Sequence, residues 1–260
     1  MMNLSFGFGP VEGEFWRWLF VMTRIAAALF AAPFFGAAGV PAQVRVIVTG
    51  AVAILVCNWT QVTAPPALLS VPGMLAIGGE VLVGLSLGFV LQLSFAAPVV
   101  AAEVIGAGMG MSIATTADPN TGAHSPALGQ YYTIVLTLIF LALGGHLLFL
   151  DLLMKSYGTF PPGHTWLGAE RFALIASYGS QMLLTAVAIA LPVTVVLLLV
   201  QLAAGMLSRT APALNLFSLG LPAGVMAGIA ALIVSAPMLP DVMSTITADA
   251  LKQAEAVIAQ

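Results

Sequence analysis

Long apolar stretches, separated by short polar or Gly/Pro-rich segments, run through most of this chain. A helix that crosses a membrane needs about 20 apolar residues, and six stretches approach or exceed that length. They cover residues 16–35, the first half of 46–79, then 75–100, 128–150, 172–208 and 214–239. The pattern predicts an all-α, polytopic membrane protein with about six long helices.

Glycine and proline interrupt these stretches and predict bent, notched helices. The chain holds 26 Gly and 16 Pro; Pro33 closes the first stretch and Pro192 predicts a kink within residues 172–208. Beyond the sixth stretch, residues 241–260 repeat apolar positions at roughly helical spacing. The set is Met243, Ile246, Ala250, Leu251, Ala254, Val257 and Ile258. It predicts a short amphipathic helix for an interface or a partner.

Composition supports the membrane class and removes others. Hydrophobic residues make up 60% of the chain and charged residues only 7%, whereas a soluble domain carries about 25% charge. No basic patch indicates nucleic acid. The single Cys57 allows neither a disulfide framework nor a cysteine metal site, and is best interpreted as a small buried hydrophobe. Glu12 and Glu14 precede the first stretch where a signal peptide would be basic, so we expect no cleaved leader.

The distribution of basic residues leaves the membrane topology open. With six spans, four basic residues fall on one side and two on the other, which is too small a difference for the positive-inside rule to assign an orientation.

Three charged residues lie within or beside apolar stretches: Arg24, Glu80 and Glu103. A charge at the bilayer centre costs at least about 2.5–3.5 kcal/mol on insertion scales, so each is a functional candidate. We favour an interpretation in which Arg24 and Glu80 are paired or capped in a protein interior. The alternative makes Glu80 a proton or cation site, although no second acidic residue at helical spacing provides a relay.

Small residues recur every four positions in two stretches. Gly84 and Gly88 form one such pair, and Gly220, Gly224 and Gly228 share one face of another predicted helix. Close backbone packing over small residues supplies much of the association between helices in lipid. The pattern fits internal packing and subunit contact equally.

A Gly-rich segment follows the third stretch and bears no resemblance to an ordinary loop. It contains Glu103, Gly106, Gly108, Met109, Gly110 and Met111, and continues through Asp118–Pro119. We expect it to break the helix. Irregular apolar backbone survives in a membrane protein only when it is buried in protein or lines a cavity, so the segment predicts a pore or gate element. Asp118 before Pro119 is first a turn residue.

Sequence patterns for catalysis are weak. His124, His146 and His164 are isolated, without metal-ligand spacing, and the chain has no Gly-x-Ser-x-Gly elbow. The Gly-x-Gly-x-Gly run lacks the strand and the basic residue of a nucleotide loop. We expect no enzyme activity, no cofactor and no metal. A membrane enzyme with a catalytic His146 would lack a partner for that histidine.

Motifs along almost the whole chain, in order, carry a family resemblance. They are Arg24, Pro33–Gly36, Pro41, Arg45, Glu80 with Gly84 and Gly88, Glu103 to Gly106, Gly110, Asp118–Pro119, Gly144–His146, Ser156–Tyr157, Pro161, Ala190–Val193, Gly205, Arg209, and the run from Pro212 through Leu214, Asn215, Phe217 and Gly220 to Pro222. Together they resemble the FliR family, the membrane export-gate subunits of flagellar and related type III secretion systems.

The resemblance implies an architecture and a location. A FliR-type subunit is similar to a fusion of two smaller gate components, so residues 1–170 would be a FliP-like part and 171–260 a FliQ-like part. One copy would join several FliP-type and FliQ-type subunits in a helical assembly in the bacterial inner membrane, within the flagellar basal body. Unfolded export substrates would pass through its centre.

The resemblance also implies roles for two segments. Residues 106–124 would plug the closed channel, with Met109, Met111 and Ile113 as apolar stoppers beside a methionine ring from the FliP-type subunits; Gly106, Gly108, Gly110, Asp118 and Pro119 belong to the same element. Residues 205–215, with Arg209, Pro212 and Asn215, would contact an FlhB-type subunit.

Two other readings of the sequence stay open. An injectisome homologue would share much of this motif pattern, although the sequence of residues 214–222 favours flagellar use. A proton-coupled secondary transporter centred on Glu80 should show a polar substrate cluster and usually an internal repeat, and we find neither convincingly.

Overall fold

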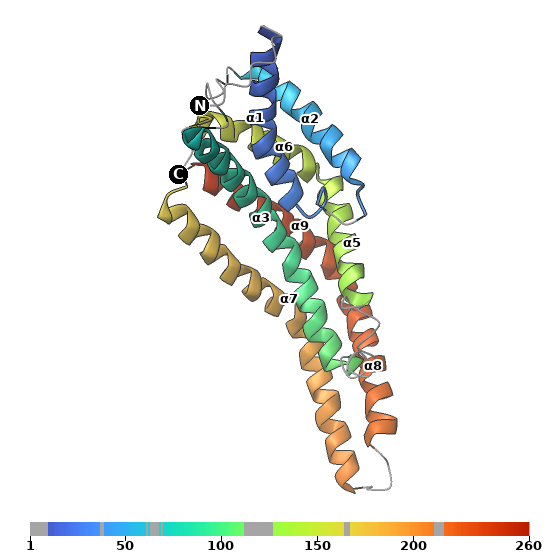
Figure 1. Cartoon of the computed structure of the whole chain (residues 1–260). Coiled ribbons are helices and arrows are strands. Elements are labelled where there is room, and N and C mark those ends of the chain that lie inside the picture. The colour runs from blue at the N-terminus through green and yellow to red at the C-terminus, as the bar shows by residue number, and fades with distance from the viewer. Residues whose placement is uncertain are drawn as a thin grey trace. The chain divides into compact units, whose positions relative to one another are not determined.

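The computed structural model describes residues 10–36, 39–60, 62, 68, 70–111, 127–163, 167–210 and 216–259. Every regular element in these ranges is a helix, which confirms the predicted fold class. The helices are α1 (Pro10–Ala31), α2 (Ala42–Trp59), α3 (Val71–Gly108), α5 (Ala127–Ala142), α6 (Gly145–Thr159), α7 (Ala169–Thr210), α8 (Leu216–Ser235), the 3-10 turn η1 (Ala236–Met238) and α9 (Leu239–Ala259) (Figure 1).

Four segments of the described chain are long and apolar enough to cross a membrane: Ala42–Trp59, Val71–Gly108, Ala169–Thr210 and Pro222–Ala259. The broken pair α5 and α6 makes a fifth when counted as one span. The structure therefore supports four or five spans, against the six expected. α1, the first expected span, falls outside this set because every 18-residue window in it contains at least three charged residues.

Two expected helices end differently in the structure. α3 was expected to span residues 75–100 but runs from Val71 to Gly108, passing through Pro98 and into the Gly-rich segment. The helix does break in this segment, as expected, but at Gly108 rather than near residue 100. Packing against the chain outweighs the roughly 1 kcal/mol cost of each helical glycine before that point. Conversely, the helix expected over 128–150 breaks between α5 and α6, where Gly144 has a φ of +70°, a value that glycine adopts without strain.

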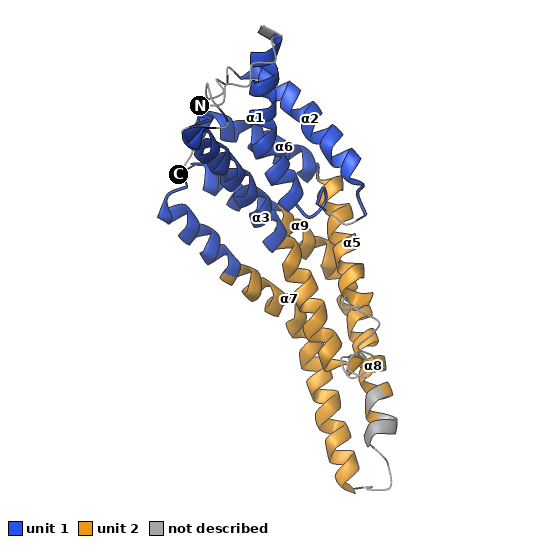
Figure 2. Ribbon diagram, in the orientation of Figure 1, with its two compact units in different colours: residues 1–93, 144–179, 248–260 blue, residues 94–143, 180–247 orange. Residues whose placement is uncertain are grey.

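The chain divides into two compact units that interleave along the sequence (Figure 2). Unit 1 holds residues 1–93, 144–179 and 248–260, and unit 2 holds residues 94–143 and 180–247. Three long helices, α3, α7 and α9, contribute residues to both units. Residue 170, where the two-part resemblance implies a boundary, lies within unit 1, and that boundary stays a prediction.

Unit 1 packs around the close approach of α1 to α3. A Cβ atom at Gly84 would overlap the carbonyl oxygen of Arg24 and lie 2.9 Å from the Cβ of Ala27. A Cβ at Gly88 would likewise overlap the carbonyl oxygen of Ala28. The two glycines thus let α3 touch the backbone of α1, so this glycine pair serves internal packing.

The amphipathic C-terminal helix is also confirmed. α9 buries Ala250, Ala254, Val257 and Ile258 in unit 1, while Lys252 and Glu255 on the opposite face are exposed. Its apolar face is covered by this chain itself, so it does not need a partner to bury it.

The contact between α1 and α3 generates a stability prediction. Gly84→Ala should destabilise the purified chain by about 1–3 kcal/mol, because overpacking against backbone atoms forces the helices apart. Gly78→Ala in the same helix is the matched control: its Cβ would meet nothing within 4 Å and should stabilise by about 0.5–1 kcal/mol. Thermal unfolding in detergent measures both. Equal melting temperatures for the two variants would contradict the proposed packing.

Candidate functional site

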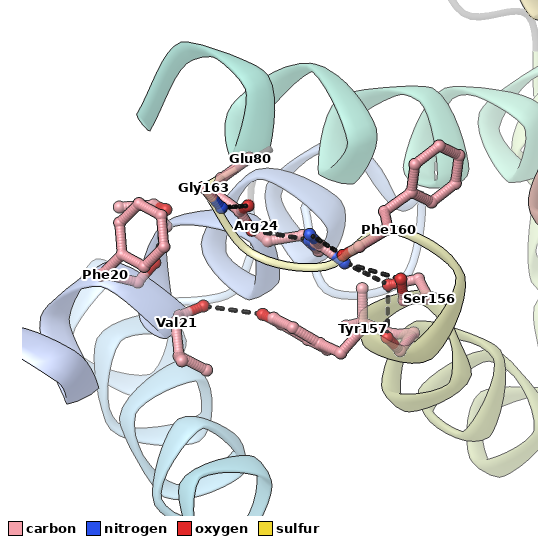
Figure 3. A network of polar contacts seen from close by, with 10 residues as sticks. Phe20, Val21, Arg24, Glu80, Ser156, Tyr157, Phe160 and Gly163 are labelled. Carbon is pink, nitrogen blue, oxygen red and sulfur yellow. Dashed lines mark hydrogen bonds and ion pairs between the residues drawn. The ribbon is translucent and has the colours of Figure 1, made fainter. Parts of the chain in front are cut away.

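Arg24 and Glu80 form a fully buried ion pair at the centre of unit 1. Arg24 Nε donates to Glu80 Oε2 at 2.7 Å, and both side chains are 0% exposed (Figure 3). α1 supplies the arginine and α3 the glutamate. The structure thus contains the buried pair of Arg24 and Glu80 that the sequence favoured.

The remaining nitrogens of Arg24 bind the C-terminal end of α6. Arg24 Nη1 donates to the carbonyl oxygen of Ser156 at 2.9 Å and to its Oγ at 3.1 Å, and Nη2 donates to the carbonyl oxygen of Phe160 at 2.9 Å. The last carbonyls of a helix lack partners within it and carry the negative end of its dipole. The Ser156 carbonyl oxygen also accepts from the backbone N–H of Phe160 at 2.9 Å. The guanidinium, with five donors in a planar fork, adds a second donor there, provides a donor for the Phe160 carbonyl oxygen, and compensates the negative charge of the helix end.

Aromatic rings complete the environment of the arginine. The Arg24 guanidinium lies 4.1 Å from the centre of the Tyr157 ring, and the Tyr157 hydroxyl donates to the carbonyl oxygen of Val21 at 2.8 Å (Figure 3). Arg171, in the first turn of α7, lies 4.2 Å from the centre of the Phe160 ring. The network therefore reaches from α1 to α3, α6 and the start of α7.

Glu80 also holds the turn after α6. Its Oε1 accepts a hydrogen bond from the backbone N–H of Gly163 at 3.3 Å, and Gly163 has a φ of +87°. Both carboxylate oxygens thus have donors. A buried pair with every group satisfied is costly to break, because removing one partner leaves an uncompensated charge worth about 3–5 kcal/mol.

A second arginine on α1 caps a second helix in the same way. Arg17, two turns before Arg24, donates through Nη2 to the carbonyl oxygens of Cys57 at 2.6 Å and Thr60 at 2.8 Å, at the end of α2. α1 therefore presents two guanidinium groups, each to the C-terminus of another helix in unit 1.

The end of α3 is anchored in unit 2. The Gly108 carbonyl oxygen accepts a hydrogen bond of 2.8 Å from Gln201 Nε2 of α7. A Cβ at Gly108 would lie 3.1 Å from Leu197 Cδ1. The last turn of α3 thus lies against α7.

Met109 packs its side chain against the glycines of α8. It is only 4% exposed, and a Cβ at Gly228 would lie 2.6 Å from both its Cγ and Cε. A Cβ at Gly224 would contact its carbonyl oxygen at 3.4 Å. These two glycines therefore make an internal contact with Met109, and its role as a pore stopper stays a prediction.

The other residues of the expected plug divide between described and undescribed parts. Gly106 is buried and Gly108 half-buried at the end of α3, Gly110 has a φ of +82°, and Met111 is half-exposed. Ile113, Asp118 and Pro119 lie outside the described residues.

Glu103 is exposed, which corrects the expectation of a buried charge. The buried side of α3 here carries Ala102, Ile105 and Met109 at helical spacing, and Glu103 projects from a different face. Of the remaining expected residues, Arg209 is exposed in the last turn of α7 and Gly220 is half-exposed in α8, while Pro212 and Asn215 lie outside the described residues.

No group of His, Cys, Asp and Glu residues within the described parts of the chain is arranged to hold a metal ion. His146, in the first turn of α6, is half-buried and no carboxylate bonds to its Nδ1.

Sequence reasoning missed several polar partners. Ser156, Phe160 and Gly163 contribute mainly backbone groups, which leave no sequence signal. Gln201 had one: it is one of only two amides in the charge-free stretch 172–208, and amide side chains in apolar helices commonly hydrogen-bond to a neighbouring helix.

The capping role of Arg24 generates a second prediction. Arg24→Lys keeps the charge opposite Glu80 but loses the fork, so the Phe160 carbonyl oxygen is left without its donor. An unsatisfied buried acceptor costs about 1–3 kcal/mol, and the melting temperature of the purified chain should fall accordingly. Arg209→Lys, at an exposed position, should change stability by less than about 0.5 kcal/mol. If Arg24→Lys behaves like this control, the cap contributes nothing.

Comparison with known proteins places the chain in a family. Residues 15–250 match the model of bacterial export proteins, family 1. The flagellar biosynthetic protein FliR of Bacillus subtilis strain 168 is 36% identical over 220 residues, which cover 83% of this chain and 84% of that protein. The FliR proteins of Pectobacterium carotovorum (33% over 223 residues, 86% and 84%) and Escherichia coli K12 (31% over 234 residues, 88% and 89%) are similar to the same extent.

The family match includes the positions of Arg17, Arg24 and Glu80 and the first half of α9. With membrane-length helices and relatives that it covers almost end to end, this chain belongs to the FliR family of bacterial export proteins.

Proposed function

We propose that this chain is a non-enzymatic subunit of the flagellar protein-export gate in the bacterial inner membrane. It would help to form the channel for unfolded export substrates and to close that channel at rest. The observation that carries the proposal is the family match over residues 15–250, together with relatives that are all named flagellar biosynthetic proteins. Those relatives favour flagellar use over an injectisome.

The length of α7 supports a role inside a larger assembly. Its charge-free stretch, residues 172–208, would be about 55 Å long at 1.5 Å per residue. A hydrocarbon core of about 30 Å accommodates only about 39 Å of helix even at a 40° tilt. Yet Leu184, Val187 and Met206 of this helix are 70%, 57% and 73% exposed. Apolar surface that the bilayer cannot cover must be covered by protein, and FliP-type and FliQ-type subunits around one copy of this chain would do so.

The anchored end of α3 supports the closing role. Residues 106–124 would form the plug, and Gly108 and Met109 fix its first residues to α7 and α8. In this proposal Met109 is the foot of the plug, while Met111 and Ile113 remain the candidates for its apolar seal. An apolar constriction excludes ions by dewetting, and methionine adapts to a seal that must reform around different cargo.

The remaining assignments follow the family likeness. Residues 1–170 and 171–260 would correspond to FliP-like and FliQ-like parts, and the connector with Arg209, Pro212 and Asn215 would contact an FlhB-type subunit. The exposed position of Arg209 at the end of α7 suits a contact with a partner.

The packing of Met109 against Gly228 allows the plug assignment to be tested. Gly228→Val should displace Met109, loosen the foot of the plug, and raise ion conductance of non-exporting membranes severalfold while the gate still assembles. Gly179→Val, at a helical glycine with nothing within 4 Å, is the control and should leave conductance at background. Met109→Ala combined with Gly228→Val removes the overlap and should reduce the leak below that of Gly228→Val alone.

Conductance is measured by patch recording or dye influx, and assembly by co-purification of the gate subunits. Background conductance in a normally assembled Gly228→Val gate would overturn the plug assignment. A chain that purifies without partners and moves a small solute would overturn the gate assignment itself.

A further inference from the structure

An apolar groove of about 600 Å³ lies among α1, α2 and α3 in unit 1, a volume typical of small-ligand sites, which span roughly 300–1,000 Å³. Its walls include Met22 and Ala26 of α1, Val48 of α2, and Val81 and Leu85 of α3. None of the contacts described above for the Arg24 network uses this space.

The two threonine hydroxyls that line the groove already have hydrogen-bond partners within the chain, so an apolar molecule can occupy the groove without leaving either hydroxyl unsatisfied. The Thr23 hydroxyl donates to the carbonyl oxygen of Phe20 at 2.7 Å, and the Thr49 hydroxyl donates to that of Arg45 at 2.6 Å. The rest of the lining, apart from Arg45, is apolar and offers water no hydrogen-bond partners. If the groove were left empty, its walls would forfeit dispersion contacts, so in a membrane a hydrocarbon chain is the natural filling.

One charged residue marks an end of the groove. Among the described residues that line it, only Arg45 carries a charge, and its guanidinium lies 5.7 Å from the centre of the Phe30 ring. Phe30, Val44 and Val46 beside it are 68%, 46% and 58% exposed, so Arg45 stands at an open side.

Arg45 also sits at one end of a membrane-length helix. It belongs to the first turn of α2, and Trp59 ends that helix about 21 Å away at 1.5 Å per residue. Arginine and tryptophan at helix ends are typical of the two membrane interfaces. The groove therefore runs from the headgroup level into the hydrocarbon region.

We propose that this groove binds one membrane phospholipid, with an acyl chain between α1, α2 and α3 and its phosphate at Arg45. A guanidinium recognises phosphate through paired N–H donors. One polar end and an otherwise apolar wall match an amphiphile with a single headgroup. A helix from a neighbouring subunit, about 10 Å wide, would not fit between α1 and α3, because α3 already contacts the backbone of α1 at Gly84 and Gly88.

Photolabelling of the full-length chain, purified with its co-purifying subunits, tests the site. The complex is reconstituted into vesicles of phosphatidylethanolamine and phosphatidylglycerol that contain a phospholipid with a diazirine in its acyl chain. Mass spectrometry then maps the labelled residues. We expect labelling to concentrate on groove residues such as Met22 and Val48 and to persist after detergent washing.

Two variants and two controls separate the site from bulk lipid. Ala26→Phe fills the groove and should reduce labelling there severalfold; Ile54→Phe, on an exposed part of α2 outside the groove, should not. Arg45→Gln should weaken retention severalfold without filling the groove, whereas Lys252→Gln, exposed on α9, should have no effect. Arg45→Gln still tests the proposal if Ala26→Phe fails to fold.

Three outcomes would overturn the proposal. They are labelling spread evenly over exposed residues of α2, labelling unchanged by Ala26→Phe and Arg45→Gln, and cross-linking of a neighbouring subunit's helix to Val48 in place of lipid. None of these outcomes bears on the export function, which conductance and co-purification test separately.

Discussion

The fold of unit 1 depends on how a permanent positive charge is accommodated away from water. An arginine cannot lose its proton in a protein, so Arg24, with no exposed surface, must have its charge and all its donors satisfied by the chain. Glu80 supplies the countercharge, and the end of α6 supplies carbonyl oxygens. Three helices must therefore be in place together for any one of them to be stable there. This requirement favours one arrangement of the helices over the alternatives. Apolar helix surfaces alone would favour it less, because lipid tails are as apolar as the helices themselves.

Glycine contacts provide the matching constraint on distance. Gly84 and Gly88 bring α3 against the backbone of α1, and Gly224 and Gly228 leave room for Met109. The first pair brings the helices close enough for Arg24 to reach Glu80. The second pair fixes Met109, directly after α3, against α8. In both units a small residue on one helix thus positions a larger side chain of another.

Much of this could be predicted from the sequence, since it rests on local pattern. Apolar length gave most helices, and the rarity of charge singled out Arg24 and Glu80 as partners. The Phe160 and Ser156 carbonyl acceptors could not be predicted, because backbone groups look alike in every sequence. The true extent of α3 was missed because its last turn is held by α7 and α8, which lie far along the chain, and local glycine content suggested a break.

Met109 illustrates the same limit for the candidate gate. Its sequence neighbourhood suggests a soft seal, yet its direction depends on a notch in α8 that is recognisable only as a glycine stripe. The sequence pattern of that stripe fits internal and intersubunit packing equally. In the structure Gly224 and Gly228 pack against Met109. The start of the Gly-rich segment is therefore attached to the rest of the chain by a contact with the helix α8.

Glu80 is the structural countercharge of Arg24, and the rest of the account depends on this role. Flux of an exported flagellar protein through gates containing Glu80→Gln tests it most directly, at a temperature where the variant gate assembles in normal amounts. Glutamine keeps the shape and an acceptor for Arg24 but does not titrate. The account predicts a less heat-stable gate with export close to the wild-type rate at the permissive temperature. Normal assembly with export abolished would contradict it.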